Sequence, residues 1–451
     1  MKKLSVRQLL TVASMLFGMF FGAGNLIFPA SMGQLAGSSL ALACAGFLIT
    51  GVGLPLLGVA ALGISREDGL LGLSSRVGRG WGLFFTCALY LTIGPFFAIP
   101  RCASVAYTVG MERLLPGTEQ SVGLALFSLL FFAAVLFFAL RPGEILTWVG
   151  KVLTPLFLAF LAVLILRALT APLGTISQIP PSGDYALSPF STGLLEGYNT
   201  MDALAGLAFG IVVVEVIGRL GVREPGDIAR NTVYAGLFSS LLMAGIYVLV
   251  AVVGAQSRGA FAAADNGGEV LAQVAEHYFG GAGAVILAVT VTVACLKTAV
   301  GLVTSCAETF AKMFPRGPAY RVWAVAFSVL SLLIANLGLD AILAYSLPVL
   351  MFLYPLAMVL ILLTLLGGRL GRDRAVLGWA TALTAVAAAV DFLRALPAPA
   401  RSAPWLEGLL AWAERWVPLA GLGFGWICPA LVGVGIGVIW RLVRQSMRRN
   451  I

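Results

Sequence analysis

Three polar side chains lie well inside long apolar segments of the chain: Asn25, Asp202 and Lys297. Polar groups in such surroundings are expensive to bury and usually mark a functional site. Asn25 supplies a neutral oxygen suited to a small hard cation such as sodium, and Asp202 supplies a negative charge for a cation or an ammonium. Lys297 is the only lysine or arginine well inside such a segment, so its ammonium needs a partner, a path to water or neutrality.

Glycines next to Asn25 favour a break in its helix, within Gly22-Ala23-Gly24-Asn25. Unwinding there exposes backbone N–H groups at the start of the second helical half, where an anion such as a carboxylate is favoured. It also exposes carbonyl groups, which can bind a cation or an ammonium. These four residues are therefore predicted to bind a substrate, with Gly22 and Asn25 also holding the coupling ion.

A second segment, Gly197–Gly210, has a similar composition, with Asp202 near the middle of its span. We expect Asp202, Ala205 and Gly206 to lie beside the same substrate, because glycine-rich interruptions in corresponding halves point to the binding site of a transporter. Two plainer alternatives stay open. Asp202 could be a structural carboxylate satisfied by hydroxyls or a basic side chain, and the glycines could only allow close helix packing. The small-residue pairs in question are Gly18 with Gly22 and Gly206 with Gly210.

Two further side chains are candidates for the site. The hydroxyl of Tyr90 lies mid-segment, beside prolines that must bend the helix, and could donate to a substrate carboxylate or to a backbone carbonyl. Lys297 precedes Thr298, so its ammonium could occupy a sodium position or lose and regain a proton during the ion-coupling step. Alternatively it reaches toward the membrane boundary and pairs with Glu215.

The elements that must position these residues are membrane-spanning helices. Hydrophobic residues make up 60% of the 451 residues, charged residues 11%, and mean hydropathy is +0.98, whereas soluble domains carry roughly 25% charged residues. About twelve apolar runs are long enough to cross a bilayer. They lie at about 9–30, 39–63, 81–107, 121–140, 147–169, 190–217, 231–254, 281–306, 322–338, 342–366, 375–396 and 419–440.

Basic residues cluster in every second loop between these runs, which favours a cytoplasmic location for those loops. Both termini are therefore expected in the cytoplasm. The same clustering explains the net charge of +9 without a nucleic-acid partner. The expected partners are the lipid bilayer and a small molecule, with no obligatory protein partner and no cofactor besides the coupling ion.

The sequence argues against an enzyme and against a channel. The single histidine, His277, falls in an expected loop, which excludes an intramembrane His-Glu zinc motif or a serine-histidine pair. No phosphate-binding Gly-x-x-x-x-Gly-Lys loop is present, so any transport is expected to be driven by ion gradients. A channel would keep the helix count but should show a symmetric filter, which twelve unequal spans do not suggest.

Several long segments resemble the branched-chain amino acid:cation symporters, the BrnQ-type system II carriers, over nearly the whole chain. They are FFGAGNLIFPASMG from Phe20, YLTIGPFFAIPR from Tyr90, GYNTMDALAGLAFGIVVVE from Gly197, TVACLKTAVGLVTSCAETF from Thr292 and ANLGLDAILAYSLPVLMFLYP from Ala335. The resemblance implies an all-α leucine-transporter type of fold in one domain, 1–451. Its parts would be five plus five inverted helices, about 9–169 and 190–366, and two extra helices at about 375–440.

What the resemblance implies for function is import of leucine, isoleucine and valine across the cytoplasmic membrane of a bacterium. The substrate site would lie between spans one, three, six and eight. Gly22 to Asn25 match the broken first helix, and Thr298 resembles the hydroxyl side of a second sodium site, so sodium is expected at Asn25 and Thr298. Neutral residues are more familiar at the positions of Lys297 and Glu215. The resemblance favours sodium as the coupling ion, and the departure at Lys297 makes the proton an alternative. Competing functions are a carrier for another small neutral amino acid, a channel or a membrane receptor.

Overall fold

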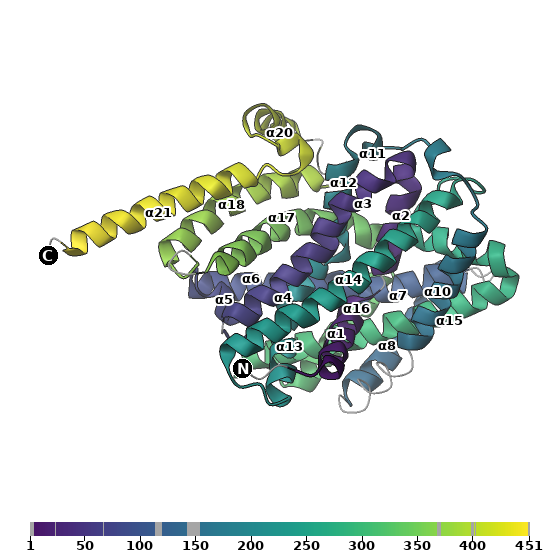
Figure 1. The fold of residues 1–451 in the computed structure, drawn as a ribbon, viewed down its shortest axis with the longest axis horizontal. Helices are drawn as coiled ribbons and strands as arrows, with labels where there is room; N and C mark the ends of the chain where they lie inside the picture. The colour runs from purple at the N-terminus through teal and green to yellow at the C-terminus, as the bar shows by residue number, and fades with distance from the viewer. Residues whose placement is uncertain are drawn as a thin grey trace.

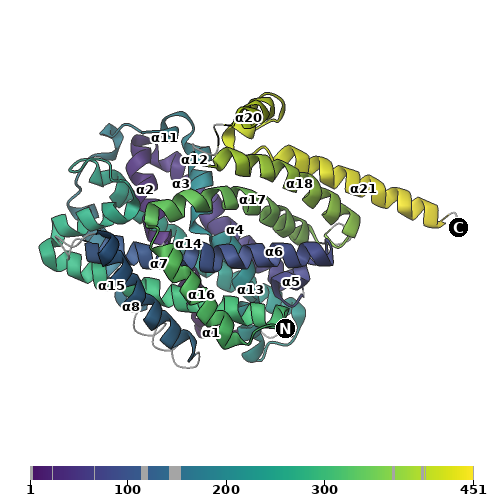
Figure 2. The same ribbon diagram turned by 180° about the vertical axis from the view of Figure 1, so that it is seen from behind.

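The chain folds as a bundle of helices. The computed structural model describes residues 4–22, 24–65, 67–112, 120–141, 154–367, 371–397, 401 and 403–449, and contains helices and no strand over those ranges (Figures 1 and 2). The α-helices are α1 Val6–Phe20, α2 Gly24–Ala36, α3 Leu40–Leu48, α4 Leu54–Ser65, α5 Gly69–Ser74, α6 Arg79–Leu91, α7 Ala98–Ala106, α8 Gln120–Ala139, α10 Thr154–Thr170, α11 Asp184–Leu187, α12 Pro189–Glu196, α13 Asp202–Arg219, α14 Pro225–Ser257, α15 Gly267–Met313, α16 Tyr320–Ala335, α17 Leu339–Leu366, α18 Arg374–Ala395, α20 Pro404–Trp416 and α21 Ile427–Arg449.

Most of these helices suit a membrane. Among the described residues, eight stretches are long and apolar enough to cross one, or nine when the bent pair Pro189–Thr200 and Asp202–Arg219 counts as one span. One stretch, Gly24–Ser65, joins the end of the first expected span to the second, and three shorter apolar helices add Val6–Phe20, Leu158–Thr170 and Tyr320–Ala335. A multi-pass membrane protein is therefore confirmed. The count of twelve, the inverted repeat and the orientation of the termini stay predictions.

Two spans are interrupted where the glycine-rich segments predicted it. The first span stops at Phe20, where α1 ends, and resumes at Gly24, where α2 begins. The sixth span continues from α12 through a short 3-10 turn, η8 (Gly197–Thr200), and then bends by 44° before α13. Met201 makes this bend possible because its backbone is left-handed, with φ 62°. Such a conformation costs a non-glycine residue about 1–3 kcal/mol and persists only where the surroundings hold it, often at functional sites.

The third span is bent, as its prolines predicted. Between α6 and α7 lies a π-helical turn, η3 (Thr92–Phe96), that contains Pro95 and a non-helical Gly94. A second π-helical turn, η4 (Tyr107–Met111), follows α7. The helical part of this span therefore continues to Met111, beyond the expected end at residue 107. Beyond the first of these turns, every residue of α7 is buried.

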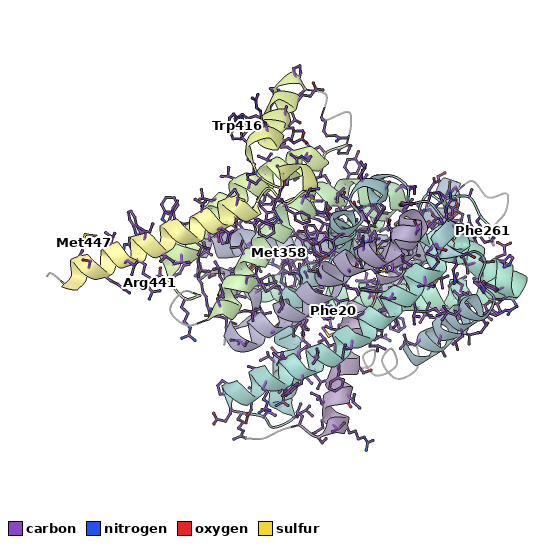
Figure 3. The ribbon with its side chains drawn as sticks, turned by 45° about the horizontal axis from the view of Figure 1, so that its top comes forward. Phe20, Phe261, Met358, Trp416, Arg441 and Met447 are labelled. Atoms are coloured by element: carbon purple, nitrogen blue, oxygen red, sulfur yellow. The ribbon has the colours of Figure 1, made fainter. Side chains whose placement is uncertain are left out.

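Small residues let the central helices approach closely. A Cβ atom on Gly206 would lie 2.7 Å from the carbonyl oxygen of Pro55, so α13 and α4 pack there through bare backbone. Between α14 and α2, a Cβ on Gly254 would overlap the carbonyl of Ala30. These contacts fix α2 and α13, the second halves of the two interrupted spans, against neighbouring helices. Phe20 lies in the interior, whereas α21 extends far from the bundle with Met447 near its end (Figures 1 and 3).

Candidate functional site

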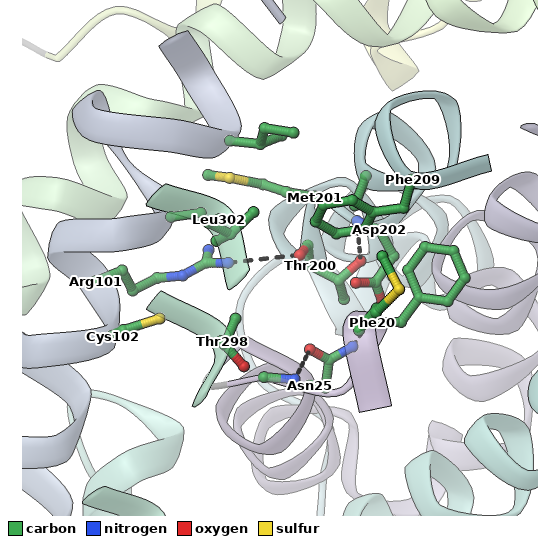
Figure 4. A pocket seen from close by; sticks show the side chains of 16 residues that line it. Phe20, Asn25, Arg101, Cys102, Thr200, Met201, Asp202, Phe209, Thr298 and Leu302 are labelled. Atoms are coloured by element: carbon green, nitrogen blue, oxygen red, sulfur yellow. Dashed lines mark hydrogen bonds between the residues drawn. The ribbon is translucent and has the colours of Figure 1, made fainter. Parts of the chain in front are cut away.

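A small cavity lies where the two breaks meet (Figure 4). Its volume is about 30 Å³, enough for about two water molecules. It is lined by residues of α1, α2, η3, α7, η8, α13 and α15, with Gly22 and Met201 at the breaks themselves: Met19, Phe20, Gly22, Gly24, Asn25, Ile93, Ala98, Arg101, Cys102, Thr200, Met201, Asp202, Ala205, Phe209, Thr298 and Leu302. Spans one, three, six and eight therefore contribute side chains to one space.

The polar centre of the site joins the two interrupted spans directly. The side-chain amide of Asn25 donates a hydrogen bond to Asp202 Oδ2 at 2.6 Å, and the hydroxyl of Tyr247 donates to the same oxygen at 2.7 Å. Asn25 also contacts the Tyr247 hydroxyl, and its own oxygen accepts a 2.9 Å hydrogen bond from the Gly22 N–H. Asn25 and Asp202 are each only 2% exposed. The two bonds to Oδ2 leave the other carboxylate oxygen of Asp202 for a ligand.

The local fold explains why a carboxylate is tolerated there. Asp202 is the first residue of α13, so its charge lies at the positive end of the helix dipole. The Asp202 N–H donates to the hydroxyl of Thr200 at 3.3 Å, which satisfies one of the open backbone donors at that end. Helix start and hydrogen bonds together stabilise a buried negative charge in the middle of the bundle.

Helix α15 faces the break in the first span with Lys297 and Thr298. A Cβ atom on Gly18 would lie 3.4 Å from Lys297 Nζ, and a Cβ on Gly22 would lie 2.9 Å from the methyl carbon of Thr298. Any larger residue at position 22 would therefore displace Thr298. The Thr298 hydroxyl donates to the Ala294 carbonyl at 3.2 Å, which leaves its oxygen lone pairs for a cation.

Arg101 is a site residue that the sequence reasoning missed. It is 4% exposed and lines the cavity, which corrects the view that Lys297 is the only basic residue deep inside a span. Its Nη1 donates to the carbonyl of Asn199 at 2.6 Å, and its guanidinium lies over the ring of Phe28 at 5.1 Å. A Cβ on Gly24 would come within 2.7 Å of Nη2. Its position directly after Pro100, in a span that two prolines were expected to bend, was the available signal.

An apolar wall completes the cavity. Phe20 of α1 and Phe209 of α13 face each other with ring centroids 6.5 Å apart, and Met19, Ile93 and Leu302 lie beside them. The site therefore has charged and polar groups on one part of its surface and aliphatic and aromatic carbon on another. This distribution fits a ligand with a charged end and an apolar end.

A larger cavity lies beyond the break, along the part of α2 that leads away from α1. Its volume is about 250 Å³. Phe28 and Asn199 line it, and both also contact Arg101. Acidic side chains, Glu196 and Asp265, are among its other lining residues. We call this the outer cavity, and the cavity at the two breaks the inner cavity. Arg101 and Phe28 therefore lie between the two.

The structure brings most of the predicted site residues together and leaves three described ones outside the lining of the cavity: Tyr90, Gly206 and Lys297. The predicted residues that line the cavity are Gly22, Gly24, Asn25, Asp202, Ala205 and Thr298. Ala23 falls outside the described residues.

Tyr90 and Gly206 each contact a neighbouring helix and are not among the residues that line the cavity. The hydroxyl of Tyr90 donates to the carbonyl of Ala208 at 3.2 Å, which is the backbone alternative. Gly206 serves the close packing of α13 against α4, as the plainer interpretation held. Glu215, a possible partner of Lys297, pairs with Arg219 at 3.9 Å in a half-exposed position.

Comparison with known proteins identifies relatives along the whole chain. The family model described as "Branched-chain amino acid transport protein" matches residues 5–444. The branched-chain amino acid permease BrnQ of Lactobacillus delbrueckii subsp. lactis is 52% identical over 432 residues, with 96% of each chain covered. The permease BrnQ of Bacillus subtilis (strain 168) is 39% identical, with 99% of each chain covered.

Solved structures share the fold at low sequence identity. The inward-facing conformation of Mhp1, a nucleobase-cation-symport-1 family transporter, matches with a TM-score of 0.62 and 17% identity, over 97% of this chain and 91% of that one. The predicted leucine-transporter type of helical fold is confirmed by this likeness.

Proposed function

The chain belongs to the family of branched-chain amino acid transport proteins, and we propose that it imports leucine, isoleucine and valine by symport with a cation. Membership of a family of permeases identifies it as a transport protein rather than an enzyme. The observation that carries the proposal is the hydrogen bond between Asn25 and Asp202, which joins the breaks of two spans at a buried cavity.

The substrate class follows from the chemistry of the cavity. An amino acid loses the water around its carboxylate and ammonium when it enters the membrane, at a cost of several kcal/mol per group, roughly, unless other polar groups replace that water. Asp202, Asn25 and the backbone at Gly22 and Gly24 supply such groups. A branched aliphatic side chain would contact the wall that includes Phe209. The family of permeases supports this choice over another small neutral amino acid.

The coupling ion is proposed to be sodium, bound near Asn25 and Thr298. Both residues line the cavity and carry neutral oxygens, which suit a small hard cation. Lys297 works against this choice because its ammonium lies beside α1 near the same break. A positively charged ammonium near this site would repel a bound sodium ion. A proton is therefore the alternative coupling ion.

Transport by alternating access fits the sizes of the two cavities. The inner cavity, at about 30 Å³, must expand before it can hold leucine, whereas the outer one has about 250 Å³. We infer that the breaks in spans one and six act as hinges for this opening, as in other carriers with discontinuous helices. The cation must favour one of the open states, because a ligand shifts a conformational equilibrium only through a difference in affinity.

The experiment that tests this function is uptake of labelled leucine into proteoliposomes. A sodium gradient and a proton gradient are imposed separately on the wild-type protein and on Lys297→Thr. We expect a sodium gradient to drive uptake by the wild-type protein and to stimulate the variant more strongly, because the repelling ammonium is gone. Equal stimulation of both proteins would contradict the role given to Lys297. Uptake that responds to neither gradient would contradict symport.

A further inference from the structure

Two opposite charges face the inner cavity without pairing with each other. Arg101 projects from α7 and Asp202 from the start of α13, and the two side chains are 4% and 2% exposed. Both line the same cavity, and the guanidinium reaches across it toward Thr200 (Figure 4). Among the ion pairs of the described residues, none joins these two side chains within 4.0 Å. The site is therefore polarised, with a positive and a negative end.

The guanidinium has hydrogen-bonding capacity to spare. An arginine side chain has five N–H donors in a planar fork. Nη1 donates to the Asn199 carbonyl at 2.6 Å, and Nη2 makes a long 3.5 Å bond to the Thr200 carbonyl. Nε is buried and has no hydrogen-bond partner. Nε and Nη2 form one edge of the fork, and such an edge matches the two oxygens of a carboxylate.

Leaving these groups as they are is unfavourable. A buried charge with unused donors costs free energy until a partner is supplied. Arg101 and Asp202 could neutralise each other only by forming a salt bridge, and no salt bridge joins these two residues. A zwitterion can complete both ends at once, because its carboxylate and its ammonium are held on one carbon atom.

We propose that Arg101 binds the carboxylate of the transported amino acid while Asp202 faces its ammonium. This assignment rests on the proposed function and deepens it, because it makes an intact α-carboxylate a requirement for binding. It also assigns the carboxylate to a side chain in addition to the backbone N–H groups near Gly22 and Gly24. The amino-acid side chain then points toward the apolar wall formed by Phe20 and Phe209.

The position of Arg101 between the two cavities supports this role. Phe28, whose ring lies under the guanidinium, and Asn199, whose carbonyl accepts from it, both line the outer cavity. A carboxylate that moves from the outer to the inner cavity therefore meets the guanidinium on its way. Backbone carbonyls of η8 hold the guanidinium in place for this encounter.

The test compares leucine with leucinamide, which keeps the ammonium and the side chain but lacks the carboxylate. Affinities for purified full-length protein in detergent are measured by calorimetry for the wild type, Arg101→Gln and Arg101→Lys. A charge-assisted hydrogen bond of this kind corresponds to about 10- to 100-fold in affinity. We expect Arg101→Gln to weaken leucine binding by about that factor and to leave leucinamide binding unchanged. Arg101→Lys should recover only part of the loss, because lysine lacks the planar fork.

The control is Ser104→Ala, which removes a buried hydroxyl on the same helix that donates to the Ala335 carbonyl at 3.1 Å. We expect this variant to bind both ligands as the wild type does. An equal loss of leucine and leucinamide binding in Arg101→Gln would show a purely structural role for Arg101. That result would overturn the inference and leave the proposed function standing. Unchanged leucine binding in that variant would overturn the inference as well. Failure of the wild-type protein to bind leucine would overturn the proposed function, and the inference with it.

Discussion

Replacing Asp202 with asparagine tests the negative end of the site, because it removes the charge and keeps the shape. Oδ2 of Asp202 accepts hydrogen bonds from Asn25 and Tyr247 at 2.6 and 2.7 Å. An asparagine oxygen in the same place can accept both, and its NH₂ group then replaces the carboxylate oxygen that is left for a ligand. An ammonium would meet a neutral donor there instead of an anion.

The magnitude follows from hydrogen-bond energies. A hydrogen bond that involves a charged group contributes about 1.5–3 kcal/mol, and one between neutral groups contributes about 0.5–1.5 kcal/mol. The difference of about 1–1.5 kcal/mol corresponds to a loss of about 5- to 12-fold in leucine affinity. The donor that Asp202→Asn turns toward the ammonium adds to this loss, so the estimate is a lower bound.

Calorimetry with leucine and with 4-methylpentanoate, which has the same carbon skeleton and no ammonium, measures the effect. We expect Asp202→Asn to weaken leucine binding by about 5-fold or more and to leave 4-methylpentanoate binding unchanged. If the variant binds leucine as tightly as the wild type, Asp202 does not contact the ammonium. The carboxylate would then be a structural group held by Asn25 and Tyr247.

Three further substitutions probe other parts of the site. Asn25→Ala removes the hydrogen bond to Asp202 and an oxygen of the proposed sodium site, so ion-dependent leucine uptake should fall; full sodium stimulation in this variant would contradict the site. Gly24→Ala places a methyl group 2.7 Å from Arg101 Nη2 and should reduce leucine uptake, whereas Gly245→Ala, with no atom within 4 Å of its added methyl, should transport normally. An active Gly24→Ala protein would argue against close contact between α2 and Arg101. Tyr90→Phe should lower the free energy of unfolding by about 1 kcal/mol, through loss of one hydrogen bond, and leave leucine affinity unchanged in a binding assay.

Composition and local chemistry predict the helical membrane fold and the two helix breaks. Charged residues are too few for a soluble surface, and glycine next to a polar residue inside an apolar run marks a place where a helix loses regular winding. Asn25 and Asp202 could be predicted as partners in one site because both lie at such places. The 2.6 Å hydrogen bond between them depends on how the two spans pack, which no local pattern encodes.

The differences between the predicted and the observed site also depend on how the helices pack. Arg101 was missed although the expected third span, 81–107, includes it, and the helical turns continue beyond that span to Met111. Tyr90 and Gly206 carry the residue types of a binding site, yet each faces a neighbouring helix rather than the cavity. Which face of a buried helix points to a ligand depends on the bend at η3 and on the contact between α13 and α4. These follow from the packing of the whole bundle.

The central claim is that the breaks of spans one and six form one substrate site, and an electron cryo-microscopy structure of the protein loaded with leucine and sodium tests it most directly. We expect density for leucine between Gly22 and Met201, with its ammonium beside Asp202 and its carboxylate beside Arg101. Leucine bound elsewhere in the bundle, or continuous helices through residues 20–26 and 201–207, would contradict the account.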